Sequence, residues 1–108
     1  MHRNLLVLCL LLSPLTGAQR TEVVGYLPHY RVDSLNALPY DSLTDVIFFS
    51  VEPKVDGSID SSDAKPAILK RLRALTTPKG VKLHLCVGGW RKSKGFSKMA
   101  ANLSTRTA

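Results

Sequence analysis

The sequence has few cysteines, few aromatic residues and no acidic residue after Asp63. Of its 108 residues, 2 are cysteine and 6% are aromatic. Cys9 lies in an apolar leader, so Cys86 is the only cysteine after the leader and no disulfide can form there. This excludes a disulfide-stabilised secreted scaffold. With 44% hydrophobic and 21% charged residues, the composition is that of a folded domain and not of a disordered chain.

Charge is divided unevenly along the chain. Residues 19–63 contain all eight acids and three bases, a net charge of −5, whereas residues 64–108 contain eleven bases and no acid, a net charge of +11. The bases fall on an expected helix face, in turns and in a loop, without a recognisable nucleic-acid motif. We therefore expect a solvated basic surface and no nucleic-acid partner.

The first eighteen residues have the pattern of a secretory signal peptide. Arg3 precedes the apolar run from Leu5 to Leu12, and Ser13-Pro14 breaks that run before Ala18. The run is too short to cross a bilayer, which needs about 18 or more apolar residues. We predict cleavage after Ala18, a secreted extracellular product of residues 19–108, and no membrane association once the signal is removed.

Three apolar stretches predict strands. They are Val23–Tyr26, Leu43–Val51 and Val81–Val87. In the second stretch apolar residues are consecutive, which is typical of a strand covered on both faces in a parallel sheet. The segment His29–Asp41 between the first two is predicted to be a long loop, and Glu52–Asp60 a turn.

Two stretches with a period of 3.6 residues predict helices. In the first, Ser61 or Ser62 would cap a helix that is ended by Pro78-Lys79-Gly80. Its apolar positions are Ile68, Leu69, Leu72 and Leu75, and those of the second helix are Phe96, Met99, Ala100 and Leu103. The alternation of strands and helices predicts an α/β fold with a parallel sheet.

The three strand segments carry a resemblance to a known family. Val23-Val24-Gly25-Tyr26, Leu43 to Phe49 and Leu85-Cys86-Val87-Gly88-Gly89-Trp90, in this order, resemble the first three strands of glycoside hydrolase family 18, the chitinases and chitinase-like lectins. The resemblance covers residues 21–107. It implies that residues 19–108 are the N-terminal part of the family's catalytic domain, with three βα units of an incomplete (β/α)8 TIM barrel.

The resemblance also implies a carbohydrate site. Tyr26 and the turn Gly88-Gly89-Trp90 would bind substrate, because glycine lets a backbone approach a sugar closely and an aromatic ring offers it a flat apolar face. A plain tight turn at the glycines and a lid at Trp90 are the alternatives. The position that supports catalysis in the family is a serine, and here it is Cys86, whose thiol is a weaker donor.

The acidic signature that the resemblance implies for catalysis, Asp-x-x-Asp-x-Asp-x-Glu, is absent. The spacing of Asp56, Asp60 and Asp63 does not match it, and we expect these residues to cap backbone groups instead. His29 and His84 have no second ligand nearby, so we expect no metal and no cofactor, with His84 satisfied within a strand. Asn102-Leu103-Ser104 is a candidate glycosylation site.

These observations predict a chain that acts on β-1,4-linked N-acetylglucosamine polymers, by chitin hydrolysis or binding within a family of glycosidases. Without the acidic signature we expect it to be inactive alone. The sequence leaves two alternatives open, namely a lectin-like product that binds chitin oligosaccharides without chemistry, and a small basic interaction module.

Overall fold

The computed structural model describes residue 17 and residues 19–107. Its strands are β1 (Val24–Pro28), β2 (Asp45–Pro53), β3 (Ile59–Asp60) and β4 (Lys82–Val87). Its α-helices are α1 (Pro66–Thr76), α2 (Phe96–Ala101) and α3 (Leu103–Arg106), and its 3-10 segments are η2 (His29–Ala37), η3 (Tyr40–Ser42) and η4 (Thr77–Lys79). Apart from Gly17, the predicted signal peptide and Cys9 lie outside the described residues.

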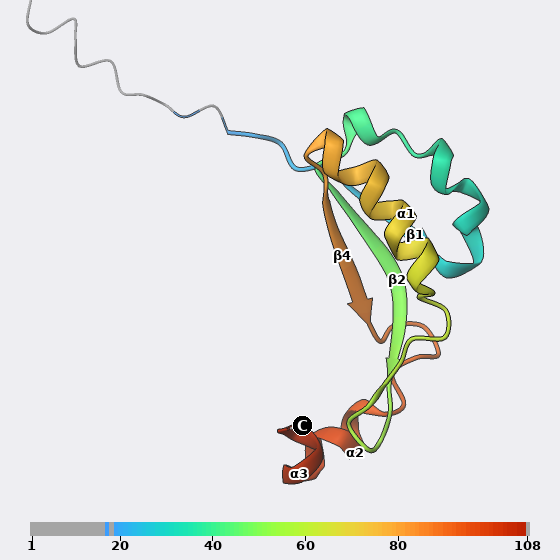
Figure 1. Cartoon of the computed structure of the whole chain (residues 1–108). Helices are drawn as coiled ribbons and strands as arrows, with labels where there is room; N and C mark the ends of the chain where they lie inside the picture. The colour runs from blue at the N-terminus through green and yellow to red at the C-terminus, as the bar shows by residue number, and fades with distance from the viewer. Residues whose placement is uncertain (1–16, 18, 108) are drawn as a thin grey trace, which may run out of the picture.

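The four strands form one mixed sheet. β1 and β4 pair in parallel with the two edges of β2, and β3 pairs antiparallel with the last two residues of β2. The α1 helix and the 3-10 segments lie on one face of the sheet, and α2 and α3 lie beyond the ends of the strands (Figure 1). The other face of the sheet carries no helix among the described residues.

The expected fold class, three βα units of a TIM barrel, is wrong. The connection between β1 and β2 forms 3-10 segments and no α-helix, so the first expected unit is missing. The sequence of η2 explains this, because Leu35 is its one buried residue and polar residues such as Asp33, Ser34 and Asn36 compete with helical hydrogen bonds. Only α1 provides an α-helical crossover between parallel strands in the described chain.

The predicted turn at Glu52–Asp60 is a β-hairpin, and this hairpin makes the sheet mixed. Gly57 has a φ of 87° and its N–H donates to the carbonyl of Lys54 at 3.1 Å. The N–H of Lys54 donates to the carbonyl of Ser58 at 2.8 Å, and β3 follows at once. A positive φ favours glycine, so Asp56-Gly57 fixes the tight reversal.

The two predicted helices differ from expectation. The first begins without the expected cap, and the second is divided in two. The α1 helix begins at Pro66 after Lys65, without a side-chain cap, so the expected serine cap is wrong. Proline suits a first helical position because its missing N–H would have had no helical partner. The C-terminal stripe forms two short helices that are separated at Asn102, whose backbone is extended.

The core lies between the sheet and α1. Leu27, Val46 and Phe48 from the strands and Leu72 from α1 are each at most 2% exposed. Burying side chains of this size stabilises a fold by about 1.5–3 kcal/mol each. This packing holds one face of β1, β2 and β4 against the helix and turns the alternate side chains of these strands toward the open face.

Candidate functional site

The open face of the sheet presents side chains in rows set by the strand register. Tyr26 of β1, Ile47 of β2 and His84 of β4 form one row. Asp45 lies one row earlier, between Val24 and Lys82, and Cys86 lies one row later beside Phe49. Parallel pairing keeps paired residues on the same face, so this arrangement follows from the register alone.

A hollow of about 370 Å³ lies on this face. It contains two of the predicted site residues, Tyr26 and Cys86, and Tyr26 is 66% exposed. The complete lining is Glu22, Val24, Tyr26, Asp45, Ile47, His84, Leu85 and Cys86. An aromatic ring, apolar side chains and two carboxyl groups are thus within reach of one ligand.

Asp45 and His84 form the polar centre of the hollow. Asp45 Oδ1 lies 2.7 Å from His84 Nε2, and the side chain of Asp45 is 11% exposed. Hydrogen bonds from the Thr44 side chain and then from His84 hold the pKa of Asp45 below its ordinary value, against the opposing effect of burial. Sequence reasoning expected a satisfied His84 but did not identify Asp45 as its partner.

The predicted Gly88-Gly89-Trp90 turn follows β4 and is not part of the lining of this hollow. Gly88 and Gly89 have φ angles of 84° and 110°. A Cβ at Gly89 would collide with the ring of Phe49, and one at Gly88 with the ring of Phe96. Packing therefore requires both glycines, which is a structural reason for them besides close approach to a ligand.

Trp90 projects from this turn and is 79% exposed. The guanidinium carbon of Arg91 lies 5.9 Å from the centroid of its ring, a cation–π geometry. Ser93 holds the turn, since its Oγ accepts from the N–H of Gly89 at 2.9 Å and donates to the carbonyl of Gly89 at 3.1 Å. A rigid turn thus presents an open aromatic surface.

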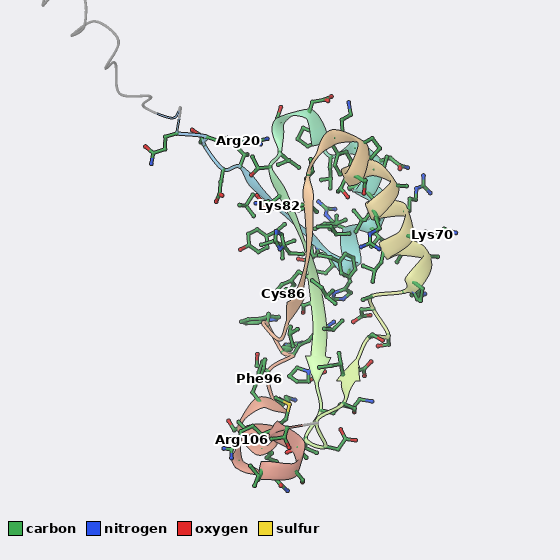
Figure 2. All side chains as sticks on the ribbon, turned by 60° about the vertical axis from the view of Figure 1, so that its left-hand side comes forward. Arg20, Lys70, Lys82, Cys86, Phe96 and Arg106 are labelled. Carbon is green, nitrogen blue, oxygen red and sulfur yellow. The ribbon has the colours of Figure 1, made fainter. Side chains whose placement is uncertain are left out.

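Cys86 is half-buried near the C-terminal end of β4, where Figure 2 labels it. Its Sγ lies 3.9 Å from the carbonyl oxygen of Gly88, which makes a weak sulfur hydrogen bond. The thiol thus makes a weak contact with the backbone of the glycine turn. Its role as a catalytic-support position stays a prediction.

A second polar cluster joins loops that are distant in sequence. Lys92 Nζ donates to Asp63 Oδ2 at 2.5 Å and to the carbonyl of Ser50 at 3.0 Å, and His29 Nε2 lies 3.9 Å from the same Asp63 oxygen. Hydrogen bonding from Lys92 lowers the pKa of Asp63, and the nearby charge of His29 adds to the effect. The expected capping role of Asp63 is wrong, and no sequence signal pointed to Lys92.

The remaining predicted residues have local roles. Asp56 Oδ1 accepts from the N–H of Ser58 and Asp60 Oδ1 from that of Ser62, each at 3.0 Å, in agreement with the expected backbone capping. Asn102 is exposed and its Oδ1 accepts from the N–H of Ser104 at 3.1 Å at the start of α3. Glycosylation of Asn102 stays a prediction.

Residues 17 and 19–107 include no group of three or more His, Cys, Asp or Glu side chains that could hold a metal ion. No helix in this part of the chain is long and apolar enough to cross a membrane. No family model matches the sequence, and no curated protein matches it.

Proposed function

We propose that the chain binds polymers of β-1,4-linked N-acetylglucosamine through the open face of its sheet, as a secreted chitinase-like protein. The observation that carries the proposal is the exposure of two aromatic rings, Tyr26 at 66% and Trp90 at 79%, at and beyond the helix-free face. Exposed rings of this kind suit the apolar face of a pyranose.

The hollow beside Tyr26 supports the proposal with polar groups. The Asp45 carboxylate is held ionised by its hydrogen bonds, and it can accept from sugar hydroxyl or amide groups. Val24 and Ile47 supply the apolar lining that an N-acetyl methyl group needs. We propose binding and not hydrolysis for this chain, because the acidic signature implied by the family resemblance is missing from it.

Fluorescence titration with a chitin tetrasaccharide tests the proposal. Trp90 is the single tryptophan, so its emission reports directly on the exposed turn. We expect a saturable change with the tetrasaccharide, and a weaker response with a cellulose tetrasaccharide, which lacks the N-acetyl groups. Tyr26→Ala should weaken binding roughly fivefold, the effect of losing about 1 kcal/mol of aromatic contact.

Tyr30→Ala is the matched control. Tyr30 is 72% exposed, like Tyr26, but it lies in η2 and not on the open face, so its replacement should leave the affinity unchanged. No response up to millimolar tetrasaccharide would contradict the proposal. Salt-sensitive binding to heparin or nucleic acid without binding to chitin would favour the basic interaction module instead.

Secretion is part of the same proposal, and it rests on the N-terminal pattern of Arg3, the apolar run and Ala18. Mass spectrometry of the mature chain from a secreting host tests it. We expect an N-terminus at Gln19, and a mature chain that keeps Met1 would contradict the proposal.

A further inference from the structure

A second concavity lies between α1 and the outer edge of β4. Its volume is about 530 Å³, and it is separate in position from the Trp90 turn. Four residues of α1 line it with the spacing of a single helix face, and three consecutive residues of β4 complete it. The lining is Pro66, Leu69, Lys70, Arg73, Leu83, His84 and Leu85. We call this concavity the edge groove.

The floor of the edge groove is apolar. Leu83 and Leu85 are two positions apart on β4, so they lie on the same face, and they line the groove together with Leu69 of α1. Leu85 is 46% exposed although it lies inside a strand next to a helix. An apolar strand residue in this position gains free energy when a further side chain covers it.

The backbone of β4 borders the edge groove. β4 pairs with β2 along one edge, and no strand among residues 19–107 pairs with its other edge. The N–H and C=O groups of such an edge are a template for another strand, and an extended peptide can add to it by main-chain hydrogen bonds. An arriving strand would place alternate side chains on the floor formed by Leu83 and Leu85.

The charge around the edge groove selects the occupant. Lys70 and Arg73 belong to its lining, no Asp or Glu does, and the chain has no acid after Asp63. Figure 2 shows Lys70 on α1 and Lys82 at the start of β4. A second copy paired through β4 would bring two edges of the same positive charge together, which is unfavourable, whereas an acidic strand would be attracted.

We propose that the edge groove binds an extended peptide segment of net negative charge, which adds to β4 as a strand and lays alternate apolar residues on the floor of the groove. This inference goes beyond the proposed carbohydrate function, because it uses the helix-flanked edge of the sheet and not its open face. The two sites share His84 and Leu85 in their linings, so variants that test the peptide site must avoid both residues.

Nuclear magnetic resonance with the full chain tests the proposal. The probe is a peptide of alternating glutamate and valine, about eight residues long, an ordinary strand length. We expect saturable shifts in the β4 amides and slowed hydrogen exchange along its outer edge. Lys70→Glu should weaken binding roughly fivefold, and raised salt should weaken it further. Lys98→Glu, which changes the charge equally but lies on α2, should leave the affinity unchanged.

Two altered peptides separate main-chain pairing from simple charge attraction. A lysine–valine peptide of the same length should not bind, and a glutamate–valine peptide methylated on the backbone nitrogens that face β4 should lose binding as well. Equal binding of either altered peptide, or no shift in β4 at millimolar peptide, would overturn the proposal. Protection of β4 that rises with protein concentration in the absence of peptide would assign the edge to a second copy and would also overturn it.

Discussion

At the scale of single residues, the open face depends on one buried charge. Asp45 is 8% exposed and its position next to His84 is set by the register between β2 and β4. A buried carboxylate is stable only with hydrogen-bond donors, and Thr44 and His84 provide them, with Lys82 contributing a favourable charge. Losing this charge should therefore affect both stability and the proposed sugar site.

The pKa of Asp45 leads to a prediction about acid stability. Because its folded pKa lies below the ordinary value of 3.8, ionised Asp45 stabilises the fold above the unfolded pKa, and this contribution is lost as pH falls through the folded pKa. Asp45→Asn should lower the urea midpoint near pH 7, and the difference from the parent chain should shrink as the pH falls below the ordinary pKa of an aspartate. Asp33→Asn, at an exposed position of η2, is the control. A difference that is constant with pH would contradict the prediction.

At the scale of elements, the sequence predicts the strands and the helix whose apolar residues follow a regular spacing. The segments that became β1, β2, β4 and α1 were each found from their apolar spacing, because burial against one another imposes that spacing. At the hairpin to β3 the sequence predicts only a turn, since only two residues pair there. For His29–Ala37 the sequence predicts a loop, because the short 3-10 turns there bury one residue and leave no periodic signal.

The turn after β4 can be tested by adding one methyl group. Gly89→Ala should lower the free energy of unfolding by about 3 kcal/mol, since alanine at a φ of 110° is strained and its Cβ would collide with Phe49. Gly80→Ala is the matched control, because Gly80 also has a positive φ, 65°, but open space around it. Its cost should be about 1 kcal/mol. Equal losses in denaturant unfolding would show that the contact with Phe49 does not matter.

At the scale of the whole molecule, the contacts that shape the site join distant parts of the chain. His84 and Asp45 are 39 positions apart, and Lys92 and Asp63 are 29 apart. Neither pair has a local pattern, so sequence reasoning found Tyr26 and Cys86 as site candidates but could not place the polar groups around them. Asp63 preceded a predicted helix and suggested a cap, whereas its partner comes from the loop after β4.

The Lys92 link should hold the two loops together. Lys92 is 16% exposed at its side chain and donates to both Asp63 and the Ser50 carbonyl, so Lys92→Met should lower the free energy of unfolding by about 1 kcal/mol, with solvent screening limiting the loss.

In an Asp63→Asn background the same change at Lys92 should cost less, because the ion pair is already gone.

Lys79→Met is the matched comparison. Lys79 and Asp41 are also 2.5 Å apart, but their side chains are 47% and 82% exposed, so water and side-chain entropy should cancel most of the attraction. Equal effects of the two lysine substitutions in urea unfolding would mean that the link across the loops is no stronger than a surface ion pair. A larger effect at Lys92 would show that this link helps to hold the loop carrying Trp90 against Asp63 and Ser50 of β2.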